Sequence, residues 1–109
     1  LLDKDFNGLC FINFVDFDSV YGHRNDANGY AKEISNFDNF LGEFIENLKS
    51  EDMLIITADH GCDPSTPSTD HSREDVPCLI YKKGVKSQNL GTKNGFNFIS
   101  KVILKEFNL

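Results

Sequence analysis

The sequence predicts an α/β fold, which we interpret as part of a three-layer α/β/α sandwich. Short apolar runs of strand length alternate along the chain with segments in which apolar residues recur every three or four positions. The links between these segments are short, as in layered α/β proteins. With 109 residues, the chain is long enough for one domain with a modest core.

The first half of the chain predicts a strand, a loop and a long helix. Residues 8–15 (GLCFINFV) form an apolar run that we expect to be an inner strand. Residues 19–25 are expected to form a loop, and residues 26–49 a helix with Asn25 or Asp26 as its N-cap. The helix is expected to bury a stripe of apolar side chains: Tyr30, Ile34, Phe37, Leu41, Phe44 and Leu48, widened by Phe40 and Ile45.

The second half predicts two further strands and a final helix. Residues 53–58 form a continuous apolar run, typical of a buried strand, which we expect to lie beside and parallel to residues 8–15. Residues 76–81 predict a third strand, and the last helix is expected from residue 93 or 94 to residue 107. These elements would leave apolar surface uncovered. We therefore expect the chain, which begins without Met, to be part of a longer protein.

Charge and cysteine content disfavour several classes of partner. The chain has 17 acidic residues, 11 lysines and arginines and a formal charge of −6, which disfavours nucleic acid and anionic membranes. No apolar run approaches the roughly 20 residues that a membrane span needs. Three widely spaced cysteines favour a reducing, cytoplasmic compartment. Cys10 and Cys78 are expected in the core, and Cys62 lacks the second Cys that would favour a soft-metal site.

Residues 58–74 (ADHGCDPSTPSTDHSRE) are the main candidate functional segment. They follow a predicted strand at its carboxyl end, where open α/β sheets place their ligands. Polar residues also follow the first predicted strand, so the two groups are expected to converge on one sheet edge. The candidate metal ligands are Asp18, His23, Asp59, His60 and His71.

This ligand set predicts two divalent cations. One tetrahedral metal takes fewer ligands from a protein, and two-metal sites with a spacing of ~3.5–4 Å typically handle phosphoryl groups. Mixed carboxylate and imidazole ligation favours Mn²⁺ or Zn²⁺ over Ca²⁺. Taken alone, Asp59 and His60 are equally well explained as loop polar residues and a helix cap. Asp16 is an alternative to Asp18, but a residue that ends a strand can simply cap the following loop.

Two segments resemble the C-terminal part of the phosphopentomutase family, manganese-dependent enzymes of the alkaline phosphatase superfamily. They are residues 14–26 (FVDFDSVYGHRND) and residues 56–75 (ITADHGCDPSTPSTDHSRED). The resemblance continues through Val76-Pro77 and Leu90-Gly91-Thr92 and covers essentially the whole chain. It implies that residues 1–109 are the C-terminal part of a metal-binding catalytic core domain, in a sandwich of the alkaline phosphatase type.

The resemblance also implies a reaction and its participants. Family members interconvert (deoxy)ribose 1-phosphate and (deoxy)ribose 5-phosphate in nucleoside salvage, through a phosphothreonine and a sugar bisphosphate activator. Carried over by motif, Asp18, His23 and His71 would hold one manganese ion, and Asp59 and His60 the other. The last carboxylate and the nucleophilic threonine would come from the remainder of the parent chain. We therefore expect no nucleophile in this chain and no mutase activity from it alone.

Other readings of these residues remain open. Arg24 and Arg73 are candidate substrate-binding residues, although Arg24 could equally pair with Asp26. A cofactor-independent phosphoglycerate mutase or a phosphodiesterase of the same superfamily would share the Asp-His-Gly step. Residues 21–24 and 69–71 favour the pentomutase over these. A non-catalytic metal-binding α/β module is the alternative from another functional class.

Overall fold

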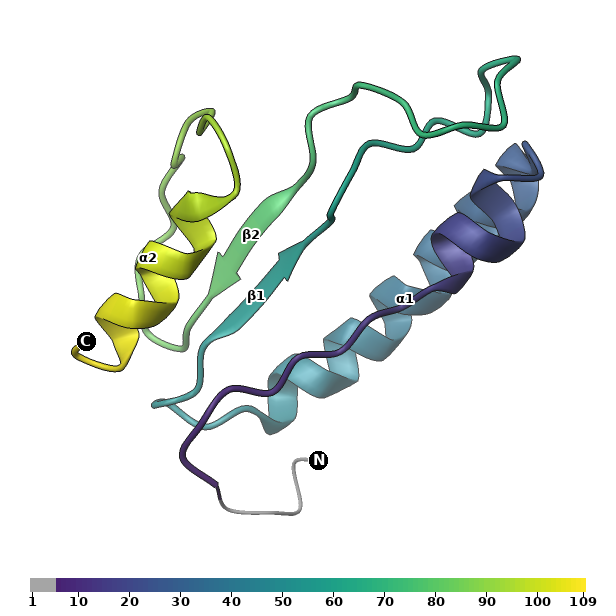
Figure 1. Ribbon diagram of the computed structural model, residues 1–109. Helices are drawn as coiled ribbons and strands as arrows, with labels where there is room; N and C mark the ends of the chain where they lie inside the picture. Colours follow the sequence, from purple (N-terminus) through teal and green to yellow (C-terminus); the bar gives the residue numbers. More distant parts are fainter. Residues whose placement is uncertain (1–5) are drawn as a thin grey trace.

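A two-stranded sheet lies between two helices in the computed structural model, which describes residues 6–109 (Figure 1). In chain order the elements are the π-helix η1 (Phe17–Gly22), helix α1 (Ala27–Asn47), strands β1 (Leu54–Thr57) and β2 (Cys78–Tyr81), and helix α2 (Asn97–Glu106). Helix α1 lies on the β1 side of the sheet and α2 on the β2 side. The α/β class is confirmed, and residues 1–5 of the expected domain lie outside the described part.

The sheet is antiparallel, with Leu54 opposite Tyr81 and Thr57 opposite Cys78. The expected parallel pairing of residues 53–58 with residues 8–15 is wrong. Residues 8–15 form no strand, because no described segment offers them a ladder of backbone hydrogen bonds, and Phe11 is 84% exposed. They still run beside α1 in the same direction as β1, so their end reaches the same edge of the molecule (Figure 1).

Helix α1 begins where the sequence predicts. The Asp26 side chain caps it by accepting a hydrogen bond from the Gly29 backbone N–H at 2.9 Å. Aromatic rings on the helix contact the preceding segment, with 5.2 Å between the ring centres of Phe14 and Phe37 and 5.5 Å between those of Phe17 and Tyr30. These contacts hold η1 against the first turns of α1.

Burial is slight throughout the described residues. Leu48 is the buried hydrophobic side chain, at 6% exposure, while Ile34 and Phe40 of the expected stripe are each 50% exposed. Cys10 is exposed and Cys78 half-buried, so the expectation that both are core residues is wrong. The radius of gyration is 15.7 Å, against about 13 Å for a compact domain of this length. The helices do not close over the sheet, which explains the exposure.

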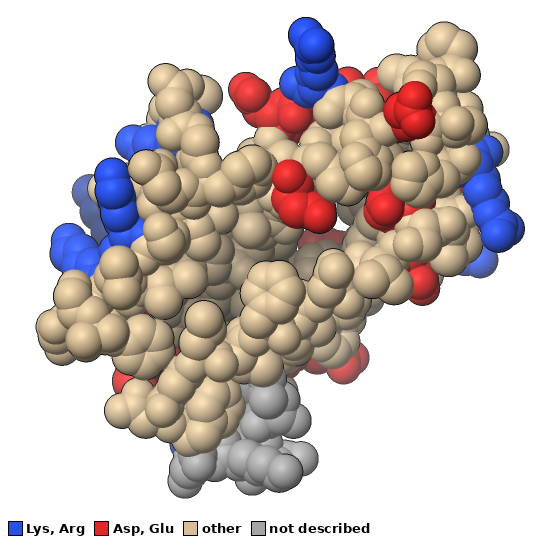
Figure 2. Space-filling model, in the orientation of Figure 1, with Lys and Arg blue, Asp and Glu red and all other residues tan. Residues whose placement is uncertain are grey.

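Lysines after β2 connect the sheet to both helices. The Lys82 ammonium group pairs with the Glu106 carboxylate of α2, and Lys83 donates to the Glu46 carbonyl of α1 at 3.2 Å. Acidic side chains gather over the upper part of the face shown in Figure 2, where η1 and the loop after β1 lie. Within residues 6–109, no helix has the length and apolar character to cross a membrane.

Candidate metal centre

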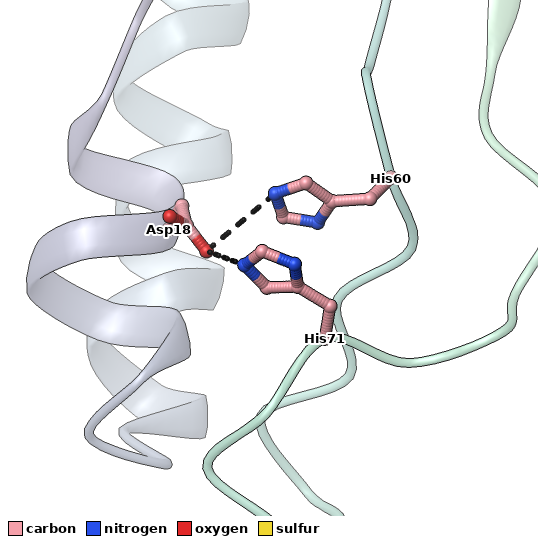
Figure 3. A group of neighbouring side chains, drawn as sticks. All are labelled: Asp18, His60 and His71. Carbon is pink, nitrogen blue, oxygen red and sulfur yellow. Dashed lines mark ion pairs between the residues drawn. The ribbon is translucent and has the colours of Figure 1, made fainter.

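One carboxylate oxygen forms the centre of the candidate site. Asp18 Oδ1 lies 3.4 Å from His23 Nε2, 3.8 Å from His60 Nε2 and 3.5 Å from His71 Nε2. Figure 3 shows Asp18 on the helical segment and the His60 and His71 rings turned toward it from the loop after β1. Residues far apart in the sequence therefore meet at one point.

The π-helix brings Asp18 and His23 onto one face. Its hydrogen bonds join residues five apart, and the His23 N–H donates to the Asp18 carbonyl at 3.0 Å. In an α-helix, residues five apart would be rotated by about 140° from each other. The wider turn places them one above the other, in the stretch that the sequence predicts as a loop.

A short ladder brings His60 and His71 together. Gly61 and Ser72 form an antiparallel bridge, in which the Ser72 N–H donates to the Gly61 carbonyl at 3.1 Å. Each histidine directly precedes one residue of the bridge, so both rings leave the same face, and their centres lie 3.5 Å apart with planes 12° apart. Gly61 is buried, and a methyl group on it would lie 2.7 Å from the Ser72 carbonyl oxygen. Glycine is therefore needed for the close approach of the returning chain.

Backbone carbonyls orient two of the imidazoles. His23 Nδ1 lies 2.6 Å from the Thr69 carbonyl oxygen, and His60 Nδ1 lies 3.0 Å from the Gly61 carbonyl oxygen. A carbonyl only accepts, so each Nδ1 carries the proton and each Nε2 presents a lone pair. Histidines that bind metals typically donate their other ring N–H to a backbone carbonyl or a carboxylate in this way.

The donor set fits a divalent cation. Asp18 Oδ1 is buried and has no hydrogen-bond partner among the described residues. It faces imidazole lone pairs, and acceptors that face one another repel unless a cation lies between them. The N···O distances of 3.4–3.8 Å exceed hydrogen-bond lengths. They approach the roughly 3.4 Å that separates two ligands each about 2.1 Å from a tetrahedral metal.

The fifth candidate ligand lies at the margin of the cluster. Asp59 Oδ1 is 3.6 Å from His60 Nε2, and the Asp59 side chain is 88% exposed. The structure thus brings all five candidate ligands into one region. Asp18, His60 and His71 offer ligand atoms within 4.8 Å of one another. This group combines two residues expected to bind one ion, Asp18 and His71, with one expected to bind the other, His60. That division stays a prediction.

The thiol of Cys62 lies beside the cluster and is protonated in the metal-free chain. Burial raises the pKa of the Cys62 thiol, and the carboxylates of Asp18, Glu74 and Asp63 raise it further. Burial likewise raises the pKa of Tyr30, with smaller contributions from Cys62 and Asp18. Without a bound metal, both groups therefore stay protonated at neutral pH.

Arg73 lies beside the site, and Arg24 directly follows the candidate ligand His23 in the sequence. Arg73 lines a cleft of about 540 Å³ between α2 and residues 58–74, which we call the ligand loop. Asp59, His60 and Lys93 also line this cleft. Within residues 6–109, Arg24 forms no ion pair with Asp26, whose carboxylate caps α1 instead. Both arginine side chains are exposed, so their predicted contact with substrate stays a prediction.

Sequence reasoning missed the features that orient the ligands. The Thr69 and Gly61 carbonyls are backbone groups, so the residue types at these positions do not indicate their role. Asp16, the alternative ligand, is exposed and its side chain makes no capping hydrogen bond to η1. The buried Gly22 between Asp18 and His23 was a signal that could have indicated close packing there.

Comparisons with known proteins agree with the resemblance. Residues 1–109 match the sequence model of the metalloenzyme superfamily. A phosphopentomutase from Lachnoclostridium phytofermentans is 59% identical over 107 residues, which cover 97% of this chain and 27% of the relative. One from Carboxydothermus hydrogenoformans is 54% identical over 110 residues, which cover 100% of this chain and 28% of the relative. The similarity to phosphopentomutases is confirmed, and this chain spans about a quarter of their length.

Proposed function

Because this chain belongs to the metalloenzyme superfamily, we propose that it carries most of the metal centre of a phosphopentomutase. In this proposal residues 1–109 form the C-terminal part of a metal-binding core domain, and the complete domain is a three-layer α/β/α sandwich. The reaction would interconvert (deoxy)ribose 1-phosphate and (deoxy)ribose 5-phosphate in the cytoplasm. The relatives described above bear the name of that activity.

One observation carries the proposal. The buried Asp18 oxygen has no hydrogen-bond donor within residues 6–109, and the Nε2 atoms of His23, His60 and His71 lie 3.4–3.8 Å from it. A structural carboxylate would accept hydrogen bonds, since a buried unsatisfied oxygen costs about 1–3 kcal/mol. A divalent cation at this point satisfies the oxygen and the imidazole lone pairs together.

The protein residues would hold and orient the ions. Asp18, His23 and His71 would bind one ion and Asp59 and His60 the other, with Mn²⁺ the proposed metal. The Thr69 and Gly61 carbonyls keep the Nε2 lone pairs aimed at the site. When bound, two such ions polarise phosphoryl oxygens and stabilise the charge that develops during transfer. Arg24 and Arg73 would hold a phosphate of the sugar phosphate substrate or of the bisphosphate activator.

The remaining groups are proposed to come from outside this chain. Serine and threonine residues of the ligand loop form turns, as where Ser65 donates to Asp63 and Thr66 donates to the Asp63 carbonyl. None of them begins a helix whose free N–H groups could bind a phosphate. We propose that another part of the parent chain supplies the nucleophilic threonine and one more carboxylate. That part would also cover the exposed apolar surface, and the 109-residue chain alone would not turn over substrate.

The natural protein that carries this chain provides the test. It is assayed with Mn²⁺, ribose 1-phosphate and a sugar bisphosphate activator, in parallel with 3-phosphoglycerate and a phosphodiester. Formation of ribose 5-phosphate is expected, with a drop of several orders of magnitude in Asp18→Asn, because the metal carries transition-state charge. Asp16→Asn is the matched control and should retain activity. Turnover of only phosphoglycerate or phosphodiester, or full activity in Asp18→Asn, would contradict the proposal.

A further inference from the structure

The two halves of the metal centre also touch through residues that are not ligands. We call Asp18 of η1 and His23, which directly follows η1, the first half-site. His60 and His71 on the ligand loop are the second half-site. Gly22, the last residue of η1, packs against the Cys62 thiol of the ligand loop. This contact directly joins the two segments that carry the half-sites.

The space at Gly22 is fully occupied. Gly22 is buried, and a methyl group on its Cα would lie 2.6 Å from Cys62 Sγ and 2.9 Å from the Phe17 carbonyl oxygen. Non-bonded heavy atoms rest at about 3.5–4 Å. Any side chain at this position must therefore push the ligand loop away or distort η1.

Backbone conformation does not explain the glycine. The described glycines with positive φ are Gly84, Gly91 and Gly95, and Gly22 is not among them. Where the backbone conformation is compatible, alanine is favoured over glycine because it restricts the unfolded chain. Glycine at position 22 is thus explained by the close approach of Cys62.

The contact lies next to ligands on both sides. Gly22 directly precedes His23, and its added methyl group would also lie 3.8 Å from Asp18 Oδ1. Cys62 follows Gly61, whose bridge to Ser72 places Cys62 opposite His71. A displacement of about 1 Å between Gly22 and Cys62, enough to restore contact distance, would change the separations between Asp18 and the imidazoles of the ligand loop.

We propose that the contact between Gly22 and Cys62 sets the separation of the two half-sites, with Cys62 acting as a positioning residue. Cys62 acts through packing, and it neither binds the metal nor touches substrate. The inference rests on the metal site of the proposed function and is independent of which phosphoryl transfer the parent protein performs.

A double-mutant cycle in the natural protein that carries this chain tests the contact. The variants are Gly22→Ala, Cys62→Ala and the double variant, in which the new methyl group occupies the space left by the thiol. Gly42→Ala is the matched control, because a methyl group on Gly42 of α1 meets nothing within 4 Å. The readouts are Mn²⁺ affinity by calorimetric titration and, in metal-free protein, the ring NMR signals of the three histidines.

Gly22→Ala should weaken Mn²⁺ binding about 10–100-fold, the range for residues that position metal ligands. In the double variant, Mn²⁺ affinity should return to within about 10-fold of that of the parent protein, because the thiol that would overlap with the new methyl group is absent. The histidine signals should move in Gly22→Ala and return in the double variant. Cys62→Ala removes the contact and should weaken Mn²⁺ binding by more than the about 3-fold spread of context effects, but less than Gly22→Ala does, because it adds no overlap. Gly42→Ala should leave Mn²⁺ affinity within about 3-fold, because its methyl group meets no neighbouring atom.

Each contrary result has a distinct meaning. Unchanged affinity and unchanged histidine signals in Gly22→Ala would overturn the proposal, as would a double variant no better than Gly22→Ala. If Gly22→Ala fails to fold while the double variant folds, the proposal is supported; failure of both overturns it. If the parent protein binds no Mn²⁺, the proposed metal site fails, and the histidine signals of the metal-free protein still decide the positioning contact.

Discussion

At the scale of single residues, the proposed metal ligand Asp18 should destabilise the metal-free fold. Its Oδ1 atom is buried, finds no hydrogen-bond donor in the described part of the chain, and faces three imidazole nitrogens. Stability and metal affinity should therefore respond in opposite directions when this oxygen is replaced by a donor.

Asp18→Asn tests this opposition. The new amide can donate to one imidazole Nε2, so the free energy of unfolding of the metal-free protein should rise by about 1 kcal/mol. Mn²⁺ affinity should fall by more than the 10–100-fold typical of outer-shell changes, since a charged ligand is lost. Urea unfolding in chelator and calorimetric Mn²⁺ titration measure the two effects. Equal stability and unchanged affinity would show that Asp18 is an ordinary surface carboxylate.

At the scale of elements, contacts with the N-terminal end of α1 position η1 and the candidate metal ligand that it carries. Asp26 caps this helix through the Gly29 N–H, and aromatic contacts tie the same end to η1. The cap is a local interaction with a known cost when removed, so it offers a direct measurement of how firmly this end of α1 is fixed.

Asp26→Ala should lower the free energy of unfolding by about 1 kcal/mol, and Asp26→Asn should lower it much less, because asparagine also caps helices well. Asp38→Ala, within the same helix (Ala27–Asn47), is the control and should be neutral or slightly stabilising. Urea unfolding of the three variants gives the comparison. An Asp26→Ala variant as stable as the control would mean that the cap does not hold α1 in solution.

The helices and the spacing of the candidate ligands were predictable from the sequence, but the pairing of the strands was not. The apolar periodicity and the Asp26 cap located α1 to within two residues of its observed end, Asn47. Residues 8–15 have a strand-like composition, but a strand also requires a partner, which depends on tertiary structure. The five candidate ligands were found because their residue types and spacing are local. The π-turn and the carbonyls that orient the imidazoles depend on backbone geometry and were missed.

At the scale of the whole molecule, the described residues bury few apolar side chains, so a bound cation should contribute a large share of the stability. Leu48 alone is a buried hydrophobic residue within residues 6–109, and the α1 and α2 helices do not close over the sheet. A cation held by both half-sites links segments that little else connects. Its effect on unfolding should therefore be large and should depend on the ligands.

Mn²⁺ at 100 times its dissociation constant should stabilise the natural protein by about 2.7 kcal/mol. His71→Ala should lose most of this increment and leave the metal-free stability nearly unchanged, because the ring is 50% exposed and its removal creates no apolar cavity. Asp70→Ala, on the adjacent exposed residue, is the control. Thermal unfolding with Mn²⁺ and with chelator measures the increments. An undiminished Mn²⁺ increment in His71→Ala would exclude His71 as a ligand.

The placement of the ligands on either side of α1 also fixes an order of events during synthesis. Asp18 and His23 leave the ribosome first, and two ligands on one turn hold a divalent cation weakly. The ladder that stacks His60 on His71 cannot form until Ser72 has emerged, because Ser72 supplies the N–H that closes it. Capture of a metal by all of these ligands must therefore wait until Ser72 has emerged, so a nascent chain that ends before Ser72 should bind Mn²⁺ only weakly.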